Sequence, residues 1–178
     1  MAHYFSPEEL LSSQKLVTVI TKEDMNYLFY LDPASRSGDG HVLRKGREIK
    51  IPIWMARLLA KEKKVEISTP MYMSKEVLQR LDTDPEIQQL DERCKDYYSV
   101  VSHIAHGLPD KRDLILKTLL KTFQKRFETI AQHSDQLQWL KEKESHKGKY
   151  SSEEKKVIRA FKRQIKRRKM KQDEKYAK

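Results

Sequence analysis

Two histidines three residues apart are the first candidates for chemistry in this sequence. His103 and His106 fall on a predicted helix, where this spacing could present two imidazoles to one metal ion. The nearest acid ahead, Asp110, follows Gly107 and Pro109 and is therefore expected outside the helix. His103 is predicted to lie opposite the apolar side of the helix. The favoured interpretation is a pair of solvated histidines, and no metal site is expected.

A single cysteine and a glycine-containing loop are the other candidates for catalysis. Cys94 falls on an apolar helix face and is predicted to be a small core residue. Gly38-Asp-Gly40 and Lys45-Gly46-Arg47 lack the strand, Lys-Ser/Thr and helix order of a phosphate-binding loop. The sequence also contains no nucleophile elbow, zincin motif or CxxC pair. We therefore expect no catalytic residues, no enzymatic activity and no cofactor.

Composition narrows the class of protein further. The only cysteine cannot form an internal disulfide, which indicates a reducing compartment. Residues 1–6 have neither the basic nor the apolar region of a signal peptide, and the best apolar run, 51–56, ends at Arg57. We expect an intracellular, soluble and helix-rich protein.

The basic charge is concentrated at the C-terminal end. The 178 residues carry a formal net charge of +11, and residues 141–178 hold 16 basic against 6 acidic side chains. Within 155–171 ten residues are basic and none is acidic. One interpretation is a nucleic-acid contact or a nuclear import signal centred on Lys166, Arg167, Arg168 and Lys169. The other is the solvated face of a helix that packs through Ile158, Phe161 and Ile165, and the two are compatible.

The elements that must position these residues divide the chain into an extended first part and a helical second part. Ser6-Pro7 predicts a short helix, since serine caps a helix and proline suits its first turn. Strands are predicted at 16–20, 27–31 and 48–51, with a flexible loop at 32–40. The domains expected are a small β-rich domain at 1–51 and a helical domain at 52–146. A basic C-terminal helix or tail follows at 147–178, either separate or as the last helix of the helical domain.

Helix signals are frequent after residue 51. Helices are predicted from Pro52 to Glu62, from 75 to 81, from 85 to 107, from 110 to about 140, and from the Ser151-Ser-Glu-Glu154 capping box onward. The helix at 110–140 carries an apolar stripe: Leu116, Leu119, Leu120, Phe123, Phe127, Ile130, Ala131 and Leu137. The fold class predicted is mainly α with a small N-terminal β-containing module, an α+β chain. Wide apolar stripes suit helices that pair within the chain or with a partner chain.

Four segments, in order, resemble one known family. They are the opening Tyr4-Phe-Ser-Pro-Glu-Glu-Leu-Leu, the segment 49–60 with Pro52 and Trp54, the Asp82-Thr-Asp-Pro85 turn followed by Tyr97-Tyr98, and Leu116-Lys-Thr-Leu-Leu-Lys-Thr-Phe-Gln-Lys-Arg-Phe127. Together they resemble the third Psf subunits of the GINS complex over residues 4 to about 135. The region after Gln136 is far more basic than that family's pattern.

The resemblance implies a structural role in DNA replication. GINS is a heterotetramer, so three other GINS subunits are expected as partners, and the fold expected is a helical-bundle domain with a small β-rich one. The complex joins the MCM motor ring and a Cdc-type scaffold protein in the replicative helicase, at origins and at the fork, in the nucleus. Expected interface or core residues are Pro52, Trp54, Leu58, Tyr97, Tyr98, Leu116, Leu120, Phe123, Phe127 and Ile130. The alternative is an autonomous nucleic-acid-binding module that acts through its basic tail.

Overall fold

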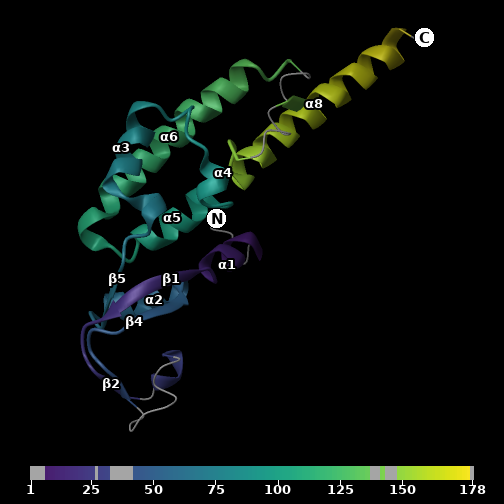
Figure 1. Ribbon diagram of the computed structural model, residues 1–178. Coiled ribbons are helices and arrows are strands. Elements are labelled where there is room, and N and C mark those ends of the chain that lie inside the picture. The colour runs from purple at the N-terminus through teal and green to yellow at the C-terminus, as the bar shows by residue number, and fades with distance from the viewer. Residues whose placement is uncertain (1–6, 27, 33–41, 137–140, 143–147, 177–178) are drawn as a thin grey trace. The chain divides into compact units, whose positions relative to one another are not determined.

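The computed structural model describes residues 7–26, 28–32, 42–136, 141–142 and 148–176 (Figure 1). The chain forms two compact units, one of residues 1–77 and 99–117 and the other of residues 78–98 and 118–178. Among the described residues, no helix combines the length and the apolar character needed to cross a membrane.

A three-stranded antiparallel sheet forms the centre of the first unit. Strand β1 (Leu16–Thr21) lies between β4 (Glu48–Pro52) and β5 (Val65–Ile67). Val19 faces Ile49 on one neighbour and Ile67 on the other, and all three side chains are buried. Side chains alternate across a strand, so Leu16 and Ile20 point to the exposed face. The predicted strands at 16–20 and 48–51 are confirmed.

Two helices flank this sheet in the sequence. Helix α1 (Pro7–Ser13) precedes β1, and α2 (Ile53–Lys61) follows β4, with Pro52 at its N-cap (Figure 1). The Ile53 amide donates to the Lys15 carbonyl at 2.9 Å, which ties the start of α2 to the start of β1. Ile53, Ala56 and Leu59 are the buried residues of α2, so both helices predicted here are confirmed.

The predicted strand at 27–31 is wrong. Strands β2 (Met25–Asn26) and β3 (Val42–Leu43) pair in a short antiparallel ribbon. Between them in the sequence lies a 3-10 turn, η1 (Phe29–Leu31). The amides of Leu31 and Asp32 donate to the Leu28 and Phe29 carbonyls at 3.1 Å, so this apolar run satisfies its backbone locally. Residue 27 and the predicted flexible loop from 33 onward lie outside the described residues.

The remaining elements are helical. They are η3 (Met71–Met73), α3 (Lys75–Thr83), α4 (Leu90–Arg93), α5 (Tyr97–Ala105), η4 (Pro109–Lys111), α6 (Arg112–Gln132) and α8 (Ser152–Tyr176). The fold class, mainly α with a small β-containing module, is confirmed. The domain boundaries at residues 51 and 146 remain a prediction.

The prediction of a single helix over 85–107 is wrong, because two short helices, α4 and α5, lie in this segment. Cys94 is extended, with φ −161° and ψ 125°, and separates α4 from α5. The Leu90 and Asp91 amides donate to the carbonyls of Lys149 and Gly148, partners distant in sequence. Local periodicity could not reveal these contacts. As a result Ile87 is exposed and Cys94 is only half-buried rather than in the core.

The helix predicted at 110–140 is shorter than expected at both ends. The 3-10 turn η4 occupies 109–111, and α6 ends at Gln132. Residues 137–140, including Leu137 of the predicted stripe, lie outside the described part. The last helix begins at Ser152, as its capping box predicts.

Candidate protein-interaction surface of the helical unit

Helix α6 presents two different faces within the second unit. Its buried side carries Thr118, Leu119, Thr122, Arg126 and Ile130, which recur at helical spacing. The sequence-predicted stripe included only Leu119 and Ile130 of these. Thr122 and Arg126 occupy the buried positions between these two residues, and Phe123 and Phe127 lie nearer to the surface.

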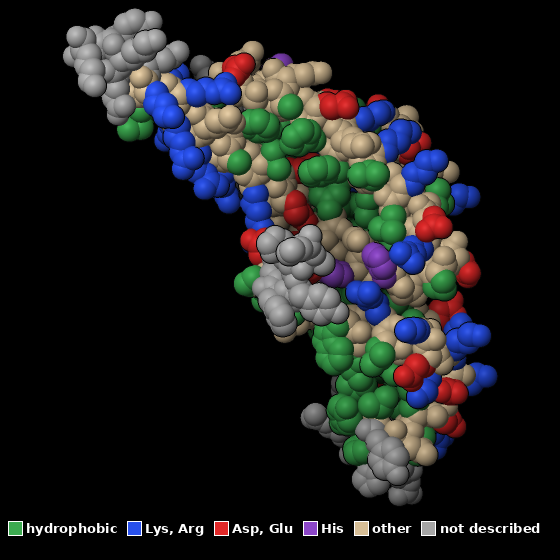
Figure 2. Space-filling model, turned by 180° about the vertical axis from the view of Figure 1, so that it is seen from behind, with side chains coloured by type: hydrophobic (Ala, Val, Ile, Leu, Met, Phe, Trp, Pro, Cys, Tyr) green, Lys and Arg blue, Asp and Glu red, His purple; other side chains and the backbone are tan. Residues whose placement is uncertain are grey.

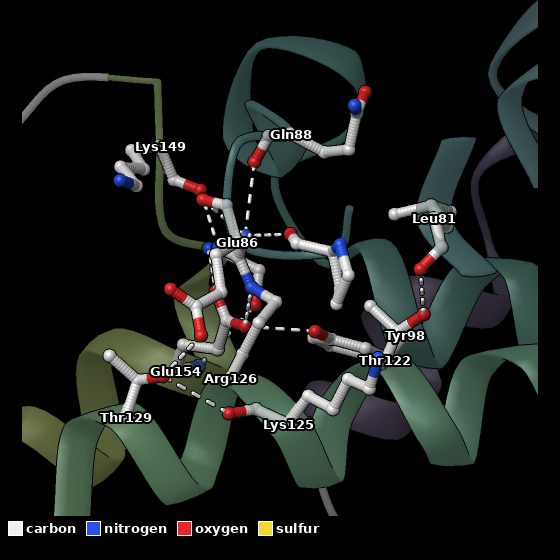
Figure 3. Close-up of polar contacts among 12 residues, drawn as sticks. Leu81, Glu86, Gln88, Tyr98, Thr122, Lys125, Arg126, Thr129, Lys149 and Glu154 are labelled. Carbon is white, nitrogen blue, oxygen red and sulfur yellow. Dashed lines mark hydrogen bonds and ion pairs between the residues drawn. The ribbon is translucent and has the colours of Figure 1, made fainter. Parts of the chain in front are cut away.

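Arg126 is the centre of a buried polar cluster (Figure 3). Its side chain is 2% exposed, and its Nε and Nη2 donate to the two carboxylate oxygens of Glu154 at 2.5 and 2.9 Å. The remaining donors reach the carbonyls of Pro85 at 2.7 Å, Gln88 at 3.1 Å and Lys149 at 2.8 Å. One guanidinium therefore joins α6 to the 85–88 segment, to the residues before α8, and to α8 itself.

Glu154 performs two roles at the start of α8. Its Oε2 accepts from the Ser151 amide at 3.0 Å while the Ser151 hydroxyl accepts from the Glu154 amide at 3.3 Å, which completes the predicted capping box. Its Oε1 accepts a hydrogen bond from the Tyr98 hydroxyl at 2.8 Å. The cap of α8 is thus fixed by the same carboxylate that neutralises Arg126.

The electrostatics of this cluster favour fixed protonation states. Burial, followed by the negative charge of Glu154, raises the pKa of Tyr98 far above its usual range and keeps the phenol neutral. Burial lowers the pKa of Arg126, but the hydrogen bond and charge of Glu154 outweigh it, and the net shift is upward. The neutral Tyr98 phenol and the charged Arg126 guanidinium therefore act as hydrogen-bond donors that hold α5, α6 and α8 together.

An aromatic series crosses the second unit beside this cluster. Tyr98 meets Phe123 edge to face with ring centroids 5.3 Å apart, Phe123 stacks on Phe127 at 6.0 Å, and Phe127 lies 6.2 Å from Phe161 of α8. Phe127 remains 38% exposed and Leu120, on the same side of α6, is 59% exposed. We call Leu120, Phe123 and Phe127 the aromatic face of α6. Hydrophobic side chains gather on the visible surface in Figure 2.

The other predicted interface or core residues fall into three groups by their exposure to solvent. Tyr97 and Ile130 are buried, whereas Trp54 and Leu58 are about half exposed one turn apart on α2. Pro52, Tyr98 and Leu116 are partly buried. Trp54 and Leu58 therefore form a second apolar pair on the surface, in the first unit.

The four predicted import or nucleic-acid residues lie on α8. Lys166, Arg167, Arg168 and Lys169 are all exposed, and Arg168 lies 3.8 Å from the Asp135 carboxylate.

The two histidines are placed differently from each other. His103 is half-buried, and its Nδ1 lies 3.4 Å from Arg57 Nη1. The prediction of a solvated surface histidine is therefore wrong for His103. Burial and then the Arg57 charge lower its pKa. His106 is exposed, and its Nδ1 lies 2.7 Å from the Ser102 carbonyl. Among the described residues no group of three or more His, Cys, Asp and Glu side chains could hold a metal ion.

Sequence reasoning missed the role of Arg126. The signal available was an arginine between Phe123 and Phe127 in a helix with an apolar stripe, together with a capping-box glutamate. Each was visible alone, but their pairing joins residues 28 positions apart and depends on the tertiary fold.

Comparison with known proteins places the chain beside replication proteins. No family model matches it. It is 27% identical over 146 residues to the DNA replication complex GINS protein psf3 of Neurospora crassa, covering 74% of this chain and 64% of that protein. It is 27% identical over 132 residues to a probable PSF3 protein of Dictyostelium discoideum, covering 74% of this chain and 47% of that protein. For the mouse PSF3 protein the identity is 26% over 137 residues, covering 74% and 63%.

The chain therefore spans about half to just under two thirds of the length of these curated relatives. The matched proteins come from a fungus, a slime mould and a mammal, and all are Psf3 proteins. This agrees with the family resemblance of the four sequence segments. The resemblance to the third Psf subunit is confirmed: the chain is similar, over about three quarters of its length, to the Psf3 proteins of the GINS DNA replication complex.

Proposed function

We propose that the chain is a non-catalytic subunit of a GINS-type DNA replication complex. The names of its relatives describe members of such a complex. The single structural observation that supports the proposal is the aromatic face of α6, where Phe127 is exposed although it stacks on Phe123, and Leu120 on the same side of the helix is exposed as well. Apolar side chains at helical spacing and exposed to water fit the core of a protein interface better than a free surface.

The buried cluster beneath this face supports the same role. Arg126 and Glu154 fix α6 relative to the start of α8 through charge-assisted hydrogen bonds. A rigid support lowers the entropy lost when a surface binds, so a preformed aromatic face is suited to assembly. Trp54 and Leu58 supply a second candidate contact on α2.

The finer parts of the proposal concern the larger assembly. We expect the heterotetramer to include three other GINS subunits and to act with the MCM motor ring and a Cdc-type scaffold protein at origins and forks in the nucleus. In this account the chain contributes contacts, and the ATP chemistry belongs to the motor ring.

Co-expression with the three other GINS subunits of the same organism tests the proposal. Tagged wild-type chain is expected to retain all three on affinity purification. Phe127→Asp places a charge in the aromatic face and is expected to lower their recovery at least tenfold, because an unpaired charge in an apolar contact is strongly unfavourable. Gln124→Asp, at an exposed polar position of the same helix, is the matched control and should leave recovery unchanged.

Far-UV circular dichroism of both variants distinguishes assembly from folding. Phe127 is partly exposed, so the Phe127→Asp chain should retain its helical signal. Full recovery of the other subunits with folded Phe127→Asp would show that this face is not the interface. Failure of the wild-type chain to retain any of them would contradict the proposed function.

A further inference from the structure

We infer that Arg57, on the outer side of α2, binds a carboxylate side chain of a partner protein subunit. Trp54, Arg57 and Leu58 are spaced three and one residues apart, which places them on one side of the helix, away from its buried residues. We call these three residues the α2 patch. The inference rests on the proposed function, because it names the chemistry of the contact that this surface of the first unit makes in the assembly.

The side chain of Arg57 is held in place at two points within the first unit. Arg57 and His103 are both half-buried, and the Arg57 Nη1 donates to the His103 Nδ1 at 3.4 Å. A guanidinium can only donate, so the imidazole accepts at Nδ1 and is neutral in this contact. A Cβ added to Gly107 would lie 3.4 Å from the Arg57 Cγ, so the backbone after α5 lies beside the arginine stem. A side chain restrained in this way loses less entropy when a ligand binds.

The charge of Arg57 is not neutralised by the described residues of the chain. Among them no carboxylate forms an ion pair with Arg57, and its Nε and Nη2 have no acceptor. Residues 1–6, 27 and 33–41, which the structure does not describe, contain a single acid, Asp39. The unused Nε and Nη2 form the planar fork that binds a carboxylate through two parallel hydrogen bonds.

The groups that face His103 fit this description of a cationic site. Burial and then the positive charge of Arg57 lower the pKa of His103, and His106 on the same helix adds to the effect. Glu9 of α1 opposes it. Glu9 is exposed and forms no ion pair with Arg57, although both belong to the described part of the first unit. A carboxylate from another chain is therefore the ligand that completes the pairing of Arg57.

The surroundings of Arg57 favour a protein over a nucleic acid as the source of the anion. Trp54 is 52% exposed and Leu58 is 53% exposed, on either side of the cation. Tryptophan and arginine are enriched among the residues that dominate protein interfaces, whereas protein–DNA interfaces are much more positively charged. Figure 2 also shows hydrophobic side chains gathered on the first unit, below histidine side chains in purple. A partner carboxylate framed by apolar side chains would pair with Arg57 and cover Trp54 and Leu58 together.

The first test is affinity purification of the tagged full chain co-expressed with the three other GINS subunits. Arg57→Gln should lower recovery of the other subunits by about tenfold or more, because it leaves the partner carboxylate unpaired in the contact. Arg44→Gln is the matched control, since it removes the same charge from an exposed position of the same unit, and it should leave recovery unchanged. Far-UV circular dichroism checks that both variants are folded.

The second test identifies the carboxylate directly. Arg57→Lys keeps the positive charge and introduces a primary amine at this position. A water-soluble carbodiimide joins an amine to a carboxylate in direct contact with it, and it is added to the co-expressed mixture before purification. Peptide mass spectrometry should then find position 57 linked to an Asp or Glu of another subunit.

Each outcome of the two tests decides the inference. Loss of recovery in Arg57→Gln alone, together with a link from position 57 to another subunit, supports it. Unchanged recovery with folded Arg57→Gln, or equal losses in Arg57→Gln and Arg44→Gln, would overturn it and leave the proposed function standing, because the wild-type chain still retains its partners. No link at position 57, or a link only to an acid of the same chain such as Glu9 or Asp39, would overturn it as well. A wild-type chain that retains none of the three subunits would contradict the proposed function and the inference with it.

Discussion

Replacing Arg126 with methionine tests the buried cluster that supports the aromatic face. Methionine keeps an unbranched side chain of similar reach but removes the charge and every donor. It leaves the Glu154 carboxylate, 1% exposed, without its cation, and leaves the carbonyls of Pro85, Gln88 and Lys149 without this donor.

The expected loss is large compared with typical protein stability. Removing one partner of a buried ion pair costs about 3–5 kcal/mol, against a total of about 5–15 kcal/mol for most domains. With a urea dependence of about 2 kcal/mol per molar, the midpoint of unfolding should fall by roughly 1.5–2.5 M. The assay is urea unfolding followed by far-UV circular dichroism at neutral pH.

Lys125→Met is the matched control, because it removes a cation from the neighbouring exposed position of α6. Its free energy of unfolding should stay within about 0.5 kcal/mol of wild type. The double variant Arg126→Met, Glu154→Met no longer buries a lone carboxylate, so its loss should be smaller than the sum of the two single losses. A loss below about 1 kcal/mol in Arg126→Met would refute the reasoning that this pair fixes the helices.

Three further predictions concern individual groups. The pKa of Tyr98 is raised from 10.0, so the unfolded chain releases this proton first and stability is lost as pH rises above about 10; Tyr98→Phe should make unfolding less sensitive to pH between 9 and 11, and an unchanged slope would contradict this. The pKa of His103 is lowered from 6.5, so stability is lost as pH falls below about 6.5, and His103→Gln should reduce the loss measured between pH 6.5 and 5. Gly148 has φ +88°, and a Cβ there would lie 2.5 Å from Glu92 Oε1, so Gly148→Ala should lower the melting temperature more than Gly46→Ala, where φ is +80° and the space is open. Equal shifts for the two glycine variants would show that the contact with Glu92 relaxes without cost.

Local rules predicted much of the fold. Alternating β-branched residues gave the correct location of β1, and the Ser151–Glu154 capping box gave the start of α8. Both signals depend only on residues close together in the sequence, so they can be recognised without knowledge of the tertiary structure. The apolar run near Phe29 carries no such signal, and its backbone closes a 3-10 turn where a strand was expected.

Hydrophobic periodicity did not predict two features of the second unit. The segment after Pro85 forms no continuous helix because its carbonyls bond to Arg126 and its amides bond to residues near Gly148. The stripe of α6 was located in the correct helix, but its buried side is rotated toward Thr122 and Arg126. A sequence pattern treats a buried arginine as polar and assigns it to solvent, so only the position of Glu154 in space could correct the assignment.

The most direct test of the account is the mass of the assembly that this chain forms when co-expressed with the three other GINS subunits, measured by native mass spectrometry. If the chain is a GINS-type subunit, the spectrum should show one species containing one copy of each subunit, and this species should be lost in Phe127→Asp but not in Gln124→Asp. A folded chain that remains monomeric in the presence of all three subunits would contradict the central claim.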